Sequence, residues 1–239
     1  KKGCALPPPS KARRGPLCDK SIAVPPQIDW VNLAIGAFAL YMLARSLPRA
    51  IAFISPRALR ISADPGLAPS PKLQRMAEAL EALGVERLGS RRETLPLHGG
   101  ALLRSDVYVS AAKDAWADVF PFKSGEPFLY FLTTFEDGAV VLTADHQWHF
   151  VERENAQAGS LPGASPEQVL RVHKVTVDRF AERHGRPHAP DDLPARLEAA
   201  RNWYRGPGSA GLRRLFIIHF LNVCVAALLL AFSVAVVLK

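Results

Sequence analysis

Apolar and polar positions are distributed unevenly along the chain. Two long apolar runs flank a central region in which apolar residues recur with helical or strand periodicity. This pattern predicts a basic Pro-rich tail (residues 1–27), a first transmembrane helix (28–47), an interfacial or linker segment (48–66), a central domain (67–205), a hinge (206–214) and a second transmembrane helix (215–238).

The second apolar run is the clearer of the two. Residues 215–238 contain no formal charge and follow Arg213 and Arg214. A bilayer core is crossed by roughly 20 apolar residues in a helix, so this run is long enough to span it. The first run is just long enough, and a buried helix of a soluble domain is its alternative interpretation. Pro48 is expected to end it, before a segment that lies on the membrane surface or leads into the domain.

The central domain carries strong helix signals. Ser70 and Pro71 supply an N-cap and a first-turn proline before apolar positions at helical spacing, which end at Gly84. Ser165 and Gln168 form a predicted capping box at the start of a second helix. A shorter helix is predicted over residues 193–204.

Between the first two helices the periodicity changes to that of strands. Alternating or continuously apolar positions predict strands near the ranges 88–97, 104–112, 115–120, 127–135 and 139–144. Asp137-Gly138 is a tight-turn signal between the last two. We therefore expect an α+β domain in which an antiparallel sheet of about 3–5 strands is covered by helices on one face.

The charge distribution favours a membrane environment. The chain has 30 Lys and Arg against 22 Asp and Glu, a formal net charge of +8. Many of the cations lie beside the apolar runs, as in membrane proteins, and no interleaving of basic and aromatic residues suggests nucleic-acid binding. The lipid bilayer and other membrane subunits are the expected partners. Arginines near the spans are more numerous on the domain side, which predicts a cytoplasmic domain in a bacterial inner membrane.

Residues that could carry chemistry form no recognised motif. The densest cluster is Asp145, His146 and His149, and the two histidines are weak candidates for metal ligands. Residues three apart on a strand point to opposite faces, and no further ligand pattern completes the set. We therefore predict no catalytic residues, no cofactor and no metal site.

The apolar runs contain features of helix contact. Asp29, Asn32, His219 and Asn222 are polar positions that either reach the membrane surface or contact another helix. The small residues Ala227, Ala231 and Ala235 recur every four positions, a spacing typical of a helix-packing face.

Three hypotheses for function follow. The first is a non-catalytic accessory or scaffold subunit of a larger membrane complex, supported by the alanine spacing and the absence of a catalytic motif. The second is a membrane-anchored sensor or regulatory module whose domain binds a ligand or protein. The third, least favoured, is a membrane-tethered hydrolase that uses Asp145, His146 and His149.

Overall fold

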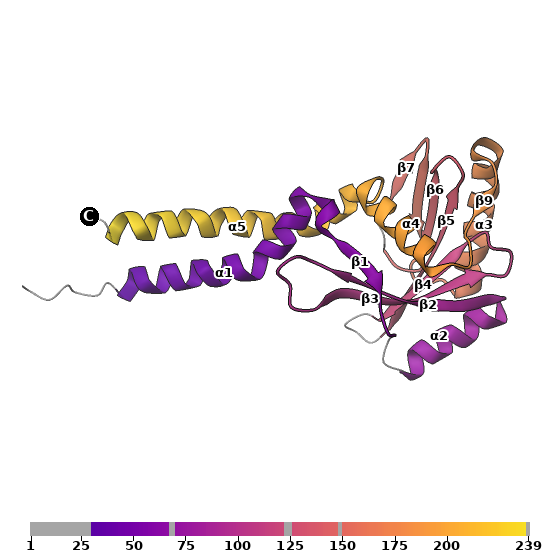
Figure 1. Cartoon of the computed structure of the whole chain (residues 1–239), viewed down its shortest axis with the longest axis horizontal. Helices are drawn as coiled ribbons and strands as arrows, with labels where there is room; N and C mark the ends of the chain where they lie inside the picture. Colours follow the sequence, from indigo (N-terminus) through magenta and orange to yellow (C-terminus); the bar gives the residue numbers. More distant parts are fainter. Residues whose placement is uncertain (1–29, 67–69, 122–125, 148–149, 238–239) are drawn as a thin grey trace, which may run out of the picture.

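The chain consists of a helical pair that projects from a mixed α+β domain (Figure 1). The computed structural model describes residues 30–66, 70–121, 126–147 and 150–237. The helices are α1 (Trp30–Ile54), α2 (Pro71–Ala82), α3 (Pro166–His184), α4 (Leu193–Arg205) and α5 (Ser209–Val237), with a short 3₁₀ helix η1 at Pro56–Ala58.

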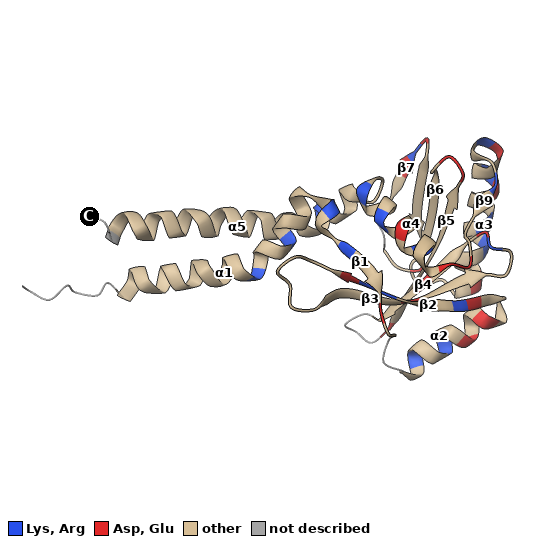
Figure 2. Ribbon diagram, viewed as in Figure 1, with Lys and Arg blue, Asp and Glu red and all other residues tan. Residues whose placement is uncertain are grey.

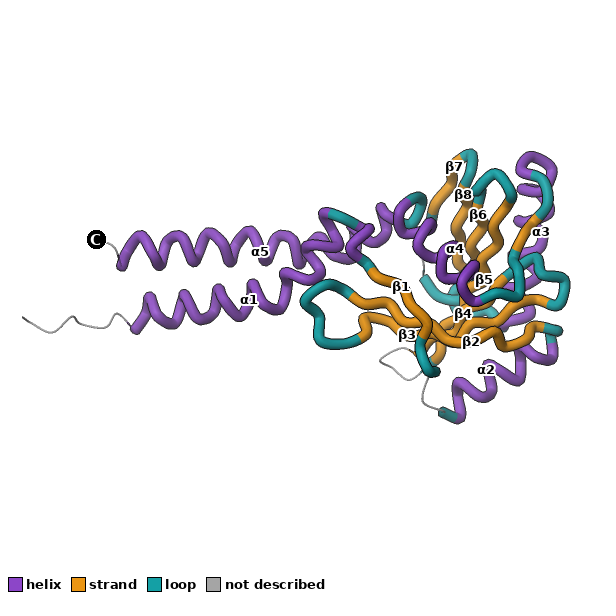
Figure 3. The backbone as a smooth tube through the Cα atoms, viewed as in Figure 1, coloured by secondary structure: helices purple, strands orange, loops and turns teal. Residues whose placement is uncertain are grey.

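The domain is built on one strongly bent sheet (Figure 3). Its nine strands are β1 (Arg60–Ala63), β2 (Val85–Thr94), β3 (Ala101–Ser110), β4 (Trp116–Pro121), β5 (Pro127–Phe135), β6 (Val140–Ala144), β7 (Val151–Arg153), β8 (Ala156–Ser160) and β9 (Pro187–His188). They follow the order β1-β2-β3-β4-β5-β6-β8-β7, and β9 pairs with β5. All pairs are antiparallel except β6 with β8.

The α+β class is confirmed, but the prediction of about 3–5 antiparallel strands was too small. The structure has a 9-stranded mixed sheet. The five predicted strands correspond to β2 through β6, and the Asp137-Gly138 turn joins β5 to β6, with Gly138 at φ 84°. The missed strands β1, β7, β8 and β9 are short and lack a clear apolar alternation, so the sequence pattern does not reveal them. β1 and β9 are held by pairing with strands distant in the chain, whereas β7 pairs with its neighbour β8.

The predicted caps of the domain helices are confirmed. The Ser70 side chain accepts a hydrogen bond from the Leu73 amide at the start of α2. At α3, Ser165 and Gln168 exchange the two hydrogen bonds of a capping box, and Gly185 follows the helix at φ 80°. Each cap satisfies backbone groups that a helix end leaves unpaired, so these boundaries are fixed locally.

Helices cover both faces of the sheet, whereas one covered face was expected. We call the face under α2 and α3 the outer face; its core contains Val119, Leu129 and Phe131. We call the opposite side the α4 face, where Trp116, Tyr130 and other sheet residues contact α4. The central strand β5 is therefore buried on both sides, as its continuous apolar sequence requires.

The helical pair is closed by a seam of small and polar residues. Asn32, Ala39 and Ser46 recur every seven positions on α1 and are buried, as are Ala226 and Ser233 on α5. A seven-residue repeat keeps one face of each helix directed at its neighbour. The Ser233 hydroxyl donates to the backbone carbonyl of Asn32 at 3.3 Å.

Both helices of the pair are long and apolar enough to cross a membrane. Only 17% and 11% of their most apolar stretches are buried, which distinguishes them from core helices of a soluble domain. Pro48 does not end α1, which continues to Ile54 before η1 and β1. A proline on a helix removes one hydrogen bond, and here the helix absorbs that loss without ending.

The pair is packed firmly onto the domain. Ala52 of α1 and Leu212 and Phe216 of α5 form a buried apolar cluster with Leu59 and Leu95. Phe53 and Phe220 stack nearby, with ring centroids 4.8 Å apart. The base of the pair is thereby part of the domain core.

Candidate functional site

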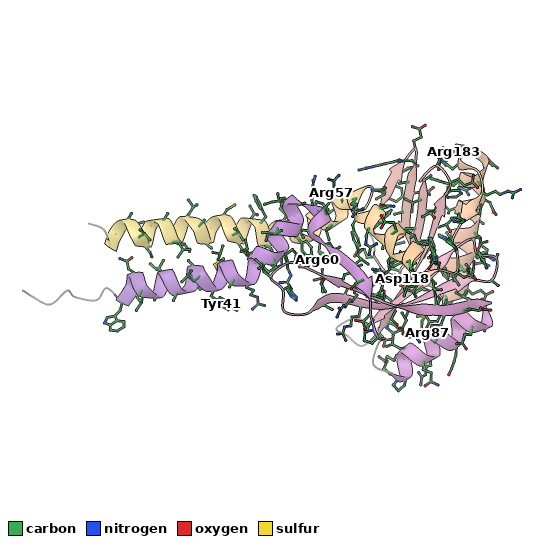
Figure 4. The ribbon with its side chains drawn as sticks, in the orientation of Figure 1. Tyr41, Arg57, Arg60, Arg87, Asp118 and Arg183 are labelled. Atoms are coloured by element: carbon green, nitrogen blue, oxygen red, sulfur yellow. The ribbon has the colours of Figure 1, made fainter. Side chains whose placement is uncertain are left out.

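A network of ionised side chains lies beneath α4, with Asp118 of β4 at its centre (Figure 4). Asp118 is 0% exposed and its two carboxylate oxygens contact two arginines. Arg91 Nε donates to Oδ2 at 2.6 Å, and Arg196 Nε donates to Oδ1 at 2.9 Å. The Tyr130 hydroxyl donates to Oδ2 at 2.9 Å and itself accepts from both arginines.

The network is balanced in charge and strongly coupled. Glu93 accepts from Arg91 Nη1 at 2.6 Å, so two arginines face two carboxylates. Burial alone would raise the pKa of Asp118, but the attraction of Arg196 and Arg91 and the hydrogen bonds it accepts hold that pKa below its usual value. Burial and the nearby carboxylates raise the pKa of Tyr130 and of Tyr204. Asp118 and Arg91 are therefore charged, and Tyr130 and Tyr204 are neutral, near pH 7.

The network ends at a cavity wall. The Tyr204 hydroxyl contacts both oxygens of Glu93, at 3.1 and 3.2 Å, and both residues line a cavity between the domain and α5. Arg196 borders a separate space of about 10 Å³, roughly the volume that one water molecule needs. Among the described residues, Arg196 Nη1 has no hydrogen-bond partner.

We call the larger space the junction cavity. Its volume is about 500 Å³, within the usual range for small-molecule sites, and its lining is mainly apolar. It is bounded by Glu93, Leu102, Leu103, Phe120, Phe128, His146, Gln147, Val151, Trp203, Tyr204, Gly208, Gly211, Leu212 and Leu215. Strands β2 to β5 and β7, the loop after β6, α4 and the first two turns of α5 all contribute.

An aromatic wall forms the sheet side of the junction cavity. Phe128 and His146 stack with centroids 4.3 Å apart, and Phe120 meets both rings edge-on. His146 Nδ1 lies 3.0 Å from Oδ1 of Asp145, and that same oxygen accepts from the Leu129 amide. This carboxylate fixes the orientation of the imidazole ring, which presents its face to the phenyl ring.

The opposite wall comes from the joint between α4 and α5. Trp203 and Tyr204 end α4, and the residues that follow leave room for them: a Cβ at Gly208 would overlap the Trp203 indole ring. The predicted hinge is thus a three-residue connection, residues 206–208, and residues 209–214 already belong to α5. The close approach at Gly208 sets the position of the indole ring at the cavity.

Arginines surround the place where the helical pair meets the domain. Figure 2 shows blue segments gathered there, whereas the outer length of both helices is uncharged. We call these residues the arginine collar: Arg45, Arg49, Arg57, Arg60, Arg205, Arg213 and Arg214. Figure 4 places Arg57 and Arg60 at this junction, on η1 and β1.

The polar and small residues predicted to make helix contacts lie on different sides of α1 and α5. Asn32 lies in the α1–α5 seam, and His219 and Asn222 are half-buried on α5. Ala227, Ala231 and Ala235 are exposed; α1 packs instead against Ala226 and Ser233 on another side of α5. A helix that packs against Ala227, Ala231 and Ala235 would therefore have to be a helix other than α1.

Two predicted positions lie outside the described residues, Asp29 and His149. Of the weak metal candidates, only His146 can be placed, in the wall of the junction cavity. Among the described residues, no three His, Cys, Asp or Glu side chains are grouped so that they could hold one metal ion.

Sequence reasoning missed the ion network. A local signal exists for its sheet members: Asp118 interrupts an apolar strand, and Arg91 and Glu93 occupy alternate positions that face the same side of β2. Arg196 gives no such signal, because an arginine on an amphipathic helix ordinarily faces water. The pairing of these residues depends on the packing of α4 on the sheet.

Comparison with known proteins gives no match: no family, no curated protein and no solved structure is significantly similar to the chain.

Proposed function

We propose that this chain is a two-pass membrane-anchored sensor or regulatory module that binds a ligand with an apolar chain in the junction cavity. It acts by binding and has no catalytic role. The observation that carries the proposal is the cavity itself, an apolar space of about 500 Å³ at the base of the helical pair. A soluble domain of this size has no folding reason to keep such a space open beside a well-packed core.

Membrane anchoring is supported by the exposed apolar surface of α1 and α5. Side chains such as Leu33, Phe38, Leu228 and Phe232 are more than half exposed. Exposing a contiguous apolar surface of this extent to water costs free energy, whereas the hydrocarbon core of a bilayer accommodates it. The excess of arginine at the junction supports a domain on the cytoplasmic side of a bacterial inner membrane.

Ligand binding near the membrane provides a route to regulation. The cavity is lined jointly by the domain and by Gly211, Leu212 and Leu215 of α5. A ligand there contacts both parts at once, so its binding energy acts on the packing of the helical pair against the domain. Such a change at the base of the pair would be passed along α5 to any neighbour in the membrane.

The test uses a brominated long-chain alcohol, because bromine quenches tryptophan fluorescence at short range and Trp203 lines the cavity. The full chain with Trp30→Phe and Trp148→Phe, which removes the tryptophan next to the lining residue Gln147, is placed in nanodiscs of unbrominated phosphatidylcholine. We expect saturable quenching that disappears when Trp203→Phe is added and weakens at least tenfold in Val151→Phe, which places a phenyl ring in the cavity and adds no tryptophan. Val175→Phe, on the exposed side of α3, is the matched control and should bind like the parent. Quenching unchanged by Val151→Phe would reject the proposal.

The second candidate is the accessory subunit, favoured by the exposed face of Ala227, Ala231 and Ala235. Small residues let a neighbouring helix approach closely, and α1 does not occupy this face. Extraction in mild detergent followed by mass spectrometry should then recover a stoichiometric partner, which Ala231→Leu would release. Recovery of the chain without partners would reject this candidate.

A further inference from the structure

We infer that the ligand of the junction cavity is an anionic amphiphile from the surrounding membrane, with its alkyl chain in the cavity and its negative headgroup among the arginines outside. The inference rests on the proposed function and specifies its ligand class. It follows from three features: what the cavity can hold, what its mouth attracts, and where it lies relative to the spans.

The interior of the cavity selects an uncharged chain. Its surface is dominated by Leu102, Leu103, Phe120, Phe128 and other apolar groups. Among the described residues that line the cavity, the one acidic side chain is Glu93, which is paired with Arg91 and accepts hydrogen bonds from Tyr204. A second negative charge placed beside Glu93 would be repelled and would lose its water, so an anionic headgroup does not enter.

The surroundings of the cavity select a negative headgroup. Arg213 and Arg214 are exposed on α5 and lie in sequence between the lining residues Leu212 and Leu215; at 3.6 residues per turn, their side chains leave the helix on either side of the face that lines the cavity. Among the described residues neither has an ion-pair partner. Both therefore remain available to a phosphate or carboxylate, to which guanidinium groups bind in a bidentate manner.

The position of the cavity along α5 indicates that the ligand comes from the membrane. The uncharged stretch of α5 begins directly after Arg214, so the cavity lies at the level where the span meets the membrane surface. Cations at this level ordinarily meet the headgroups of anionic lipids. A chain can thus pass sideways into the cavity while its headgroup stays at the surface, without crossing water.

The experiment compares brominated chains of equal length in the Trp30→Phe, Trp148→Phe protein in phosphatidylcholine nanodiscs. We expect the brominated fatty acid to quench Trp203 at a concentration about fivefold to twenty-five-fold lower than the alcohol, given roughly 1 kcal/mol for each arginine near a charged group. Arg213→Gln with Arg214→Gln should abolish this preference and leave binding of the alcohol unchanged. High salt should also reduce it, because exposed charges are screened.

The matched control removes two arginines elsewhere. Arg171→Gln with Arg183→Gln changes the net charge equally on α3, and Figure 4 places Arg183 far from the junction. This variant should keep the full preference for the acid. If it loses the preference as the Arg213 and Arg214 variant does, general charge is responsible and the inference is overturned.

The outcomes separate the inference from the proposed function. Equal quenching by acid and alcohol would overturn the anionic headgroup while leaving chain binding intact. Quenching of Trp203 by neither probe would overturn both. A further arm replaces the acid by nanodiscs of brominated phosphatidylglycerol or phosphatidylcholine: preferential quenching by the phosphatidylglycerol supports a phospholipid of the bilayer, and preference for the free acid supports a fatty acid as the source.

Discussion

The outer face and the α4 face of the sheet are packed in different ways. On the outer face, α2 and α3 cover side chains such as Leu129 and Phe131, which are almost completely buried. A single buried histidine, His173, lies there between the hydroxyls of Thr133 and Thr143. On the α4 face, the core contains four ionised groups and then opens into the junction cavity.

This difference separates stability from binding. A continuous apolar layer stabilises a fold by excluding water and filling space. Buried ion pairs contribute little net stability, because desolvation offsets their attraction, but they hold their members in fixed positions. The network on the α4 face orients Glu93 and Tyr204 at the cavity, and we interpret that positioning as its role.

The largest expected effect comes from breaking the network. Asp118→Asn leaves Arg91 and Arg196 without their shared carboxylate, and removal of one partner from a buried pair costs about 3–5 kcal/mol. Urea unfolding of the purified protein in detergent, followed by tryptophan fluorescence, measures the loss. Asp178→Asn on the exposed side of α3 is the control, with an expected change within about 0.5 kcal/mol. Equal stability of the two variants would show that the network does not constrain the fold.

A second pair of variants compares the two faces directly. Leu129→Ala creates a void in the outer core and should reduce the free energy of unfolding by about 2–5 kcal/mol. Leu103→Ala, in the cavity wall, should cost less than about 1 kcal/mol, because its side chain already borders open space. The same unfolding measurement applies. Similar losses at both positions would contradict the distinction between the faces.

The joint between α4 and α5 predicts a smaller effect. Gly208→Ala forces the Trp203 ring to move, and such overpacking typically costs about 1–3 kcal/mol. Because the ring lines the cavity, quenching of Trp203 by the brominated chain should weaken as well. Gly138→Ala, in a turn distant from the cavity, tests whether any glycine substitution has this effect; it should lower stability through its positive φ yet leave quenching unchanged.

The smallest expected effect is a pH dependence of the outer face. Burial lowers the pKa of His173 to about 3, so the folded protein does not protonate it in mild acid. The unfolded chain does so near pH 6.5, and the stability contribution is complete above that pH and lost as the pH falls toward 3. Between pH 6.5 and 5.5 the loss is about 1 kcal/mol for this residue. His173→Gln should remove this part of the slope in unfolding measured across pH; an unchanged slope would show that another group causes it.

The sequence predicted the elements that local signals determine. Ser70, Ser165 and the Asp137-Gly138 turn fix helix starts and a hairpin through bonds between near neighbours. The short edge strands give no such signal: β1 takes its hydrogen bonds from residues about 30 positions away, and β7, although it pairs with the adjacent β8, has only three residues. The sequence analysis did not identify the α1–α5 seam, which the seven-residue spacing of Asn32, Ala39 and Ser46 on α1 marks. The alanine face of α5 is exposed, and a helix contact there stays a prediction.

The candidate site could be predicted only in part. His146 was noticed as a member of a polar cluster, but its stacking on Phe128 depends on the return of the chain after β6. The junction cavity is formed by segments up to 122 residues apart, from Glu93 to Leu215, and no periodicity within one segment reveals it. Arg196 appears exposed in the pattern of α4 and is buried because the sheet curves around that helix.

The most direct test of the central claim is to locate a bound chain. A fatty acid with a photoactivatable diazirine at the end of its chain is added to the full-length protein in nanodiscs and cross-linked, and the labelled residues are identified by mass spectrometry. We predict labels on the β3–β5 peptides that carry Leu103, Phe120 and Phe128, and their loss in Leu103→Trp but not in Val175→Trp. Labels confined to the exposed surfaces of α1 and α5, and unaffected by Leu103→Trp, would contradict a ligand in the junction cavity.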